Sequence, residues 1–403
     1  MSITNNHKHT IAASCIGSAT QAVVNNFAPL LFLTFQATYG ISLEKITLLI
    51  TLNFMLQLFV DLLSAKFIDK IGYRNAAVGA HIFAGVGLAG LGFLPDLIDP
   101  YAGLILCVSL CAVGGGLEEV LVSPIVESCP TKKKSAVMSF LHSFYSWGSV
   151  LVIALSTLFF LAVGIEHWKW LACAWAILPL ANANYFSFVP IYNTKEENEK
   201  GIGLKKLFSL KIFWIFALLM MTAGAAELAM SQWASAFAES ALGVDKTLGD
   251  LFGPCLFAVM MGLSRTLYAK IGEKTDLFAY MIFSACLCAL SYVLAAFSPA
   301  SWLSLAACGL CGFSVGAMWP GTVSASAKTI RNGGTAMFAM LALFGDLGAS
   351  VGPSLVGLAS GALGGDLQKG LIFAVVFPLL ALLGIFLSKR EQKKLPLKSE
   401  EQK

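Results

Sequence analysis

Two adjacent carboxylates, Glu118 and Glu119, lie within an apolar segment at about residues 101–126. This segment is long enough to cross a bilayer, and an ionised carboxylate near the bilayer centre costs about 2.5 kcal/mol or more. Acidic residues at such positions are usually functional, because a carboxyl group removed from water can bind and release a proton in the physiological range. The pair therefore predicts a proton-handling site inside a membrane.

The two glutamates cannot share one environment. Successive residues of a helix point about 100° apart, so at most one of Glu118 and Glu119 faces a central cavity. The residue that does so is a candidate for proton binding. An acid held between helices by a lysine, an arginine or a backbone donor would instead be structural. From spacing alone, either residue can take either role.

A further acid in an apolar segment is Glu227, which is followed by Gln232 and Trp233. A carboxylate and an amide supply the acceptors and donors that sugar hydroxyls need. The ring of Trp233 offers a flat apolar face for a pyranose, and packing at the membrane interface is its structural alternative. These three residues predict a group that binds a solute.

Polar residues four positions apart form a stripe on the second apolar segment, at Asn53, Gln57 and Asp61. Residues at this spacing lie on one face of a helix. We expect Asn53 and Gln57 to line the cavity. Asp61 lies nearer the end of the segment, and we expect it to join a latch with Lys66 or Arg74.

Three more polar residues are candidate contacts for the solute. Asn25 and Asn26 lie in the first apolar segment, where Asn25 is four residues after Gln21. His142 lies beside serines in the fifth segment, where its imidazole can accept a hydroxyl, relay a proton or simply pack.

Arg265 and Asp346 are the other charged residues inside apolar segments. Arg265 predicts an ion pair that acts as a gate. Asp346 is either a second proton or cation site or the partner of Arg265.

The composition sets the class of protein that must position these residues. The chain of 403 residues is 57% hydrophobic and 12% charged, whereas soluble domains carry about 25% charged residues. It is therefore an integral membrane protein. Its ten cysteines lie in or beside apolar segments and predict packing residues, with neither a disulfide framework nor a metal site. The first segment is too long for a signal peptide, so we expect it to remain as a helix.

Twelve apolar segments are long enough to span a membrane as helices. Alternate loops and the two ends hold 22 of the 27 basic residues, which predicts that both termini are cytoplasmic. The net charge of +4 is thus a topology signal and does not indicate nucleic-acid binding. The segments are 11–37, 44–67, 76–95, 101–126, 135–163, 168–190, 213–239, 247–270, 276–298, 301–328, 334–362 and 368–388.

The chain divides into two similar halves of six segments. Residues 141–150 and 341–350 share a leucine, a phenylalanine and a glycine at a constant offset. Two halves with internal symmetry are typical of carriers whose site lies between the halves. The predicted units are an N-terminal six-helix bundle (1–192), a cytoplasmic linker (193–212), a C-terminal six-helix bundle (213–390) and a cytoplasmic tail (391–403).

The segment 65–74 resembles the loop motif of the major facilitator superfamily, Gly-x-x-x-Asp-Arg/Lys-x-Gly-Arg-Arg/Lys. Asp69, Lys70, Gly72 and Arg74 match the motif, while its first glycine is an alanine here. The resemblance covers essentially the whole chain and implies the all-α membrane fold of that superfamily. It also implies that the four matching residues latch neighbouring helices on the cytoplasmic face and release them when that face opens.

Within the superfamily, the chain resembles the fucose–proton symporter branch. The pattern Gly-x-Gly-x-x-Glu-x-x-x-Asn-Pro of that branch falls on residues 114–124, with serine in place of asparagine. This registration implies that Glu119 is the proton-coupling residue and leaves Glu118 as its neighbour. The Glu227-to-Trp233 spacing and the run at Asn25 also resemble that branch, whose nearby aspartate falls on Pro29 here.

These observations predict a proton-coupled secondary transporter of a small polar solute, in the first instance a monosaccharide. A drug or metabolite antiporter on the same fold and a sodium-coupled sugar symporter are the alternatives. We find no motif of an enzyme, so we expect no catalytic residue, no cofactor and no metal. The expected partners are the solute and the lipid bilayer, and the expected form is a monomer that crosses the cytoplasmic (inner) membrane many times.

Overall fold

A computed structural model describes residues 6–131, 134–192, 202–271, 276–330 and 333–392. Within these ranges the chain is helical and has no strand. Nine of the described helices are long and apolar enough to cross a membrane. The prediction of an all-helical membrane protein is therefore confirmed.

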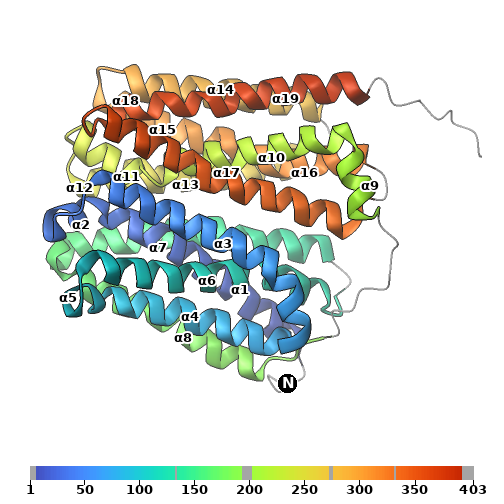
Figure 1. The fold of residues 1–403 in the computed structure, drawn as a ribbon, viewed down its shortest axis with the longest axis horizontal. Coiled ribbons are helices and arrows are strands. Elements are labelled where there is room, and N and C mark those ends of the chain that lie inside the picture. Colours follow the sequence, from blue (N-terminus) through green and yellow to red (C-terminus); the bar gives the residue numbers. More distant parts are fainter. Residues whose placement is uncertain (1–5, 132–133, 193–201, 272–275, 331–332, 393–403) are drawn as a thin grey trace, which may run out of the picture.

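The N-terminal half packs into one bundle, drawn from blue to green in Figure 1. Its main contacts join α4 to α6 and α8, and α1 to α6 and α7. Its helices are α1 (His7–Phe27), η2 (Ala28–Leu31), α2 (Phe32–Tyr39), α3 (Leu43–Ile71), α4 (Tyr73–Leu91), α5 (Leu94–Leu97), α6 (Pro100–Glu127), α7 (Lys134–Val163), η3 (Ile165–His167) and α8 (Trp168–Phe188).

The C-terminal half forms a second bundle beside the first, in which α10 packs against α17 and α19. Its helices are α9 (Leu204–Ser209), α10 (Lys211–Ser231), α11 (Ala234–Ala236), η4 (Phe237–Ala241), α12 (Lys246–Asp250), η5 (Leu251–Cys255), α13 (Leu256–Ile271), α14 (Leu277–Phe297), α15 (Ser301–Val315), α16 (Met318–Thr329), α17 (Gly334–Ala362), α18 (Leu367–Leu371), η6 (Ile372–Val375) and α19 (Val376–Gln392).

Each of the twelve predicted segments falls on at least one of these helices. The segments outside the nine candidate spans contain α1 with α2, α4 and α8. Several polar side chains, among them Gln21, Asn25 and Asn26, lower the hydropathy of α1. The total of twelve spans and the cytoplasmic termini stay predictions. Part of the predicted linker is helical (α9), and its residues 193–201, like the tail from 393, lie outside the described ranges.

The two ends of the molecule differ in what they carry. The start of α1, α9 and the end of α19 lie at one end, which we call the terminal end, and α2, α5, α12 and α18 lie at the other, which we call the far end (Figure 1). The halves meet mainly through α3 against α17 and α7 against α13. Each of these four helices therefore runs along the interface between the halves.

Gly72 shows how local sequence controls a connection. It has φ +83° and joins the end of α3 directly to the start of α4. A positive φ at this position strains any residue with a Cβ, so the tight turn favours glycine. This agrees with the turn that the loop motif implies, and it places α3 and α4 side by side at the terminal end.

Glycines in α6 allow two neighbouring helices to approach closely. A Cβ on Gly114 would lie 2.6 Å from the backbone nitrogen of Ala84 on α4. A Cβ on Gly116 would lie 3.1 Å from the Cα of Gln57 on α3. Small residues allow such approaches between membrane helices. The approach at Gly116 brings the polar stripe of α3 next to the acidic turn of α6.

Candidate functional site

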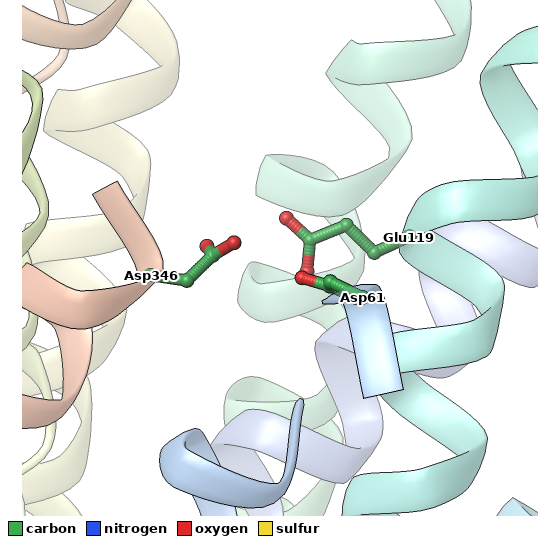
Figure 2. A group of neighbouring side chains, drawn as sticks. All are labelled: Asp61, Glu119 and Asp346. Carbon is green, nitrogen blue, oxygen red and sulfur yellow. The ribbon is translucent and has the colours of Figure 1, made fainter. Parts of the chain in front are cut away.

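Three carboxylates gather at the interface between the halves. Asp61 on α3, Glu119 on α6 and Asp346 on α17 each place one carboxylate oxygen within 4.8 Å of the others. Figure 2 shows Asp346 reaching across from the C-terminal half towards the other two. All three side chains are partly buried. The group, which we call the acid cluster, therefore spans both halves.

Ionising all three groups of the acid cluster together is costly. Two unit charges 4.8 Å apart repel by about 3 kcal/mol at an effective dielectric constant of about 20. No lysine or arginine among the described residues forms an ion pair with Asp61, Glu119 or Asp346. Neutralising part of this charge, by protons or by another cation, would therefore favour contact between the halves here.

Glu119 is oriented by a hydrogen bond from the first helix. The side-chain nitrogen of Gln21 donates to Oε2 of Glu119 over 2.6 Å. This bond helps to hold the carboxyl group of Glu119 beside Asp61 and Asp346. Gln21 thus has a direct role that its spacing relative to Asn25 did not indicate.

A second charged group lies at the same interface. Arg265 on α13 is 3.5 Å from Glu227 on α10, and its Nη1 donates to Oγ of Ser146 on α7 over 3.1 Å. Nε of Arg265 is buried without a hydrogen-bond partner among the described residues. The predicted ion pair of Arg265 is therefore formed with Glu227, whereas Asp346, the other expected partner, lies in the acid cluster.

A small cavity, with room for about one water molecule, lies beside this ion pair. Polar and apolar side chains both line it. Glu227 is one of the polar residues, and Asn26 is another, which also donates to Ser149 over 3.1 Å. The polar lining residues are Asn26, Tyr145, Ser149, Glu227 and Ser231, and the apolar ones are Leu228, Pro254, Phe257, Ala258 and Met261.

The remaining amides form a connected group nearer the far end. Gln57 donates to Oδ1 of Asn25 over 2.9 Å, and Gln232 donates across the interface to the backbone oxygen of Asn25 over 3.1 Å. Asn25, Asn53 and Gln232 are polar members of the lining of a small, largely apolar pocket. The polar stripe of α3 therefore faces the interior, as its spacing predicts.

Glu118 points away from this interface. It is buried in the N-terminal half, where His81 Nε2 lies 3.5 Å from its Oε1. Glu119 and Glu118 therefore occupy different environments, as the 100° rotation between them requires.

Trp233 lies towards the far end of the interface, and His142 lies towards the terminal end. Trp233 is fully buried, its Nε1 donates to the backbone oxygen of Pro353, and its ring packs against Phe32. Its face is thus not open to a solute in this conformation. His142 is exposed, one helical turn from Ser146 towards the terminal end.

The predicted latch at the terminal end is only partly described. Arg74 donates to the backbone oxygens of Phe186 and Ser187 at the end of α8, and Lys70 is exposed. The side chains of Lys66 and Asp69 lie outside the described residues. Asp61 does not join Arg74, because the four-residue spacing from Gln57 carries it to the face of α3 that meets α6 and α17.

The far end of the interface is closed by contacts that sequence reasoning missed. Lys246 on α12 donates to the backbone oxygen of Leu30 in the other half over 2.7 Å, and lies 3.1 Å from the buried Asp250. Oγ of Thr51 and Oγ of Ser354 are 2.5 Å apart across the halves. The four-residue spacing of Lys246 and Asp250 could have suggested their pairing. No local sequence pattern indicates that Lys246 and Asp250 lie at the interface between the halves.

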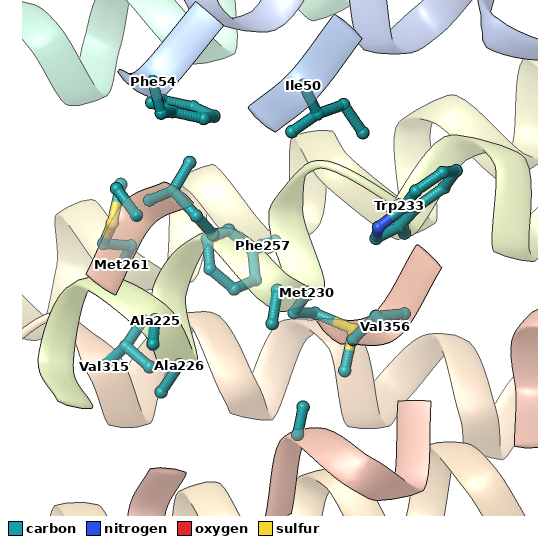
Figure 3. Close-up of a cluster of buried hydrophobic side chains, with 14 of the residues drawn as sticks. Ile50, Phe54, Ala225, Ala226, Met230, Trp233, Phe257, Met261, Val315 and Val356 are labelled. Carbon is teal, nitrogen blue, oxygen red and sulfur yellow. The ribbon is translucent and has the colours of Figure 1, made fainter. Parts of the chain in front are cut away.

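An apolar layer reinforces this closure. Figure 3 shows Ile50 and Phe54 of α3 facing residues of the C-terminal half. Trp233 and Val356 belong to the same buried cluster. Contacts across the interface therefore extend from the far end down to the acid cluster, and the exposed His142 lies beyond them.

A helical membrane protein of two packed halves, with its charged residues at their interface, has the architecture of a transporter. The comparison with known families specifies which one. The model of the Major Facilitator Superfamily matches residues 13–353. The chain therefore belongs to the Major Facilitator Superfamily, whose members are membrane transporters and generally not enzymes. No curated protein sequence matches the chain.

Solved structures of this superfamily share the fold at low sequence identity. A bacterial homologue of the human lysosomal transporter Spinster, inward-facing and unoccupied, has TM-score 0.78 and 14% identity, over 96% of this chain and 98% of that one. The E. coli fucose:proton symporter FucP has TM-score 0.64 and 14% identity, over 94% and 98%. The nucleoside transporter NupG has TM-score 0.73 and 13% identity, over 94% and 99%.

Proposed function

We propose that this protein is a proton-coupled secondary transporter of a small polar solute, in the first instance a monosaccharide, in the cytoplasmic (inner) membrane. The observation that carries this proposal is the acid cluster, in which Asp346 of one half meets Asp61 and Glu119 of the other within 4.8 Å. Because the cluster lies between the halves, its charge affects whether the halves stay together at this point.

The coupling follows from the repulsion within the cluster. Bound protons allow the carboxyl groups to hydrogen-bond to one another and hold α3 and α6 against α17. Loss of a proton restores the repulsion and favours separation of the halves. The protonation state and the conformation are then linked, which is what a proton-driven carrier requires.

The conformation fits one step of alternating access. The distribution of basic residues predicts that the terminal end is cytoplasmic. The far end, closed by Lys246 and by the apolar layer, would then face outside. On this orientation the closed far end corresponds to an inward-facing state, and the exposed His142 lies on the cytoplasmic side of Ser146.

The residues around the cavity beside Arg265 and Glu227 have the chemistry that a polyhydroxylated ring needs. The polar ones offer donors and acceptors for hydroxyl groups, and the apolar ones offer packing for the face of a ring once the cavity widens. Two structural neighbours are named as transporters of fucose and of nucleosides, and both of these solutes contain a sugar ring. This likeness supports a sugar-containing solute without selecting one.

An antiporter of cationic solutes is the second candidate function. The acid cluster has no basic partner among the described residues, and a cationic solute could replace its protons. Exchange of an organic cation for protons would use the same linkage between charge and conformation. A sodium-coupled sugar symporter is the remaining alternative.

Uptake into proteoliposomes would test the proposal. Proteoliposomes that contain the purified protein are given a panel of radiolabelled monosaccharides. Uptake is measured with an inward proton gradient, with an inward sodium gradient and with no gradient. We expect accumulation of at least one sugar with the pH gradient alone, and loss of accumulation in Glu119→Gln. Glu44→Gln, at an exposed position, is the matched control and should transport normally.

Three outcomes would contradict it. Accumulation that follows the sodium gradient would show that protons are not the coupling ion. Full activity of Glu119→Gln would remove that residue from coupling. Exchange of organic cations for protons, with no sugar uptake, would support the antiporter instead.

A further inference from the structure

A titratable pair that the proposed transport cycle does not use lies inside the N-terminal half. Glu118 on α6 and His81 on α4 are each 1% exposed, and Oε1 of the glutamate is 3.5 Å from Nε2 of the imidazole. Asn182 on α8 and the backbone of Ala13 on α1 complete the surroundings. Four helices of one half therefore enclose this pair away from the interface between the halves.

The hydrogen bonds of His81 determine which of its nitrogens carries hydrogen. Nδ1 lies 2.8 Å from the backbone oxygen of Ala77, and because a carbonyl only accepts, Nδ1 is the donor. Nε2 lies 2.7 Å from Nδ2 of Asn182. That amide nitrogen also donates to the backbone oxygen of Ala13 over 2.9 Å, which fixes the orientation of the amide.

Nε2 of His81 therefore faces a donor and must accept. An imidazole that donates from Nδ1 and accepts at Nε2 is neutral. His81 in this arrangement cannot supply a positive charge to balance an ionised Glu118.

Glu118 has no other group to stabilise a negative charge. Neither of its carboxylate oxygens has a hydrogen-bond partner, and no lysine or arginine of the described residues forms an ion pair with it. The other titratable groups nearby are Cys111, two turns earlier on α6, and Glu119, which points to the interface. A buried carboxylate without a partner is far more costly than a buried carboxylic acid.

We propose that Glu118 is a second proton-binding site, which holds a resident proton that is not transported. The proton stays on Glu118 because His81 is neutral and offers no positive charge to an ionised carboxylate. Nδ1 of His81 donates to Ala77, and Nε2, the nitrogen nearest to Glu118, accepts a hydrogen bond from Asn182. Unlike the acid cluster, the site lies within one half, so alternating movement of the halves does not open it. The proposal does not depend on which solute is carried.

Infrared spectroscopy of the purified protein in lipid would detect this proton. We expect a protonated-carboxyl band that is absent in Glu118→Gln and persists in the wild type from about pH 5 to pH 8. Nitrogen-15 NMR of the wild type should show His81 as the neutral tautomer with hydrogen on Nδ1. His81→Gln assigns this signal among the five histidines.

Stability gives an independent readout. Glutamine resembles a neutral glutamic acid in shape and charge, so Glu118→Gln should change the melting midpoint by less than about 2 °C. An imidazolium signal from His81, no band that depends on Glu118, or a fall of more than about 6 °C in Glu118→Gln would indicate a buried ion pair and overturn the proposal. The NMR measurement needs no Glu118 variant. It therefore tests whether His81 is neutral even if Glu118→Gln fails to fold.

Discussion

Glu118 and Glu119 are neighbours in sequence but belong to two different regions of the molecule. Glu119 faces the interface between the halves, within 4.8 Å of carboxylates on α3 and α17. Glu118 is enclosed by helices of one half, with His81 as its nearest titratable partner. In the proposed transport cycle, position between the two halves, more than burial, decides whether an intramembrane acid couples protonation to movement.

The same contrast holds for the other polar contacts. Arg265 with Ser146, Lys246 with Leu30 and the acid cluster all join one half to the other, so each must change when the halves move. Asn182 with His81 joins helices within one half. Substitutions at the first kind of contact should alter the balance of conformations, whereas those at the second should alter stability alone.

The largest effect is expected at Arg265. Arg265→Met leaves Glu227 buried without its partner, and removing one member of such a pair costs about 2–4 kcal/mol, since Arg265 is partly exposed. We expect a lower melting midpoint and loss of transport. Glu227→Gln in the same protein should recover most of the stability but not the transport.

A double-mutant cycle on the melting midpoint checks this pair. Strong coupling between positions 265 and 227 would support the ion pair between Arg265 and Glu227. Additive effects of the two substitutions would show that Arg265 and Glu227 act independently, and would contradict the assigned ion pair.

An intermediate effect is expected at Lys246. Lys246→Met removes a charged donor to Leu30 across the halves, a contact worth about 1.5–3 kcal/mol, which corresponds to about a 10- to 100-fold change in a conformational ratio. Asp250→Asn and Glu239→Gln are introduced in both the test and the reference protein, because Lys246 pairs with both carboxylates and neither should be left unpaired. We expect the far end to open more often.

Accessibility of cysteines introduced at positions 51 and 354 measures this opening. These two positions are in contact across the halves near the far end. Faster labelling in Lys246→Met than in the reference is the expected outcome. Equal labelling rates would mean that Lys246 does not hold the far end closed.

The smallest effect is expected at Asp96, which lies outside the interface between the halves. The hydrogen bond from Lys169 holds the pKa of the Asp96 carboxyl below its usual range. Such a group stabilises the fold above its unfolded pKa of about 3.9 and loses this contribution only as the pH falls through its folded value. Because the carboxylate is largely exposed, Asp96→Asn should cost less than about 1 kcal/mol at neutral pH.

Thermal melting of Asp96→Asn and the wild type from neutral to acidic pH measures this cost. The small difference should disappear only in strong acid. A large difference in melting midpoint at neutral pH would show that a surface pair within one half stabilises the protein as much as the contacts between the halves. It would contradict the distinction between these two kinds of contact.

Sequence alone predicted the fold well, because a bilayer demands long apolar helices and basic loops. The face of α3 that carries Asn53 and Gln57 was also predictable, since four-residue spacing fixes which side chains share a face. Gly72 was predictable because a direct turn between α3 and α4 needs a positive φ.

The partners of the charged residues were not predictable. Periodicity shows which face a residue occupies but not which distant helix meets that face. Asp61 was therefore expected beside Lys66 or Arg74, whereas α6 and α17 bring Glu119 and Asp346 to it. His81 carried no signal at all, because its contacts with Glu118 and Asn182 depend on how α4, α6 and α8 pack.

The central claim is that Glu119 couples proton movement to transport and that Glu118 does not. The most direct test records the pH inside proteoliposomes while a transported sugar is added, without an imposed gradient, for Glu119→Gln and Glu118→Gln in parallel. We expect sugar-driven proton entry to be lost in Glu119→Gln and retained in Glu118→Gln. Loss in Glu118→Gln with retention in Glu119→Gln would contradict the assignment of coupling to Glu119.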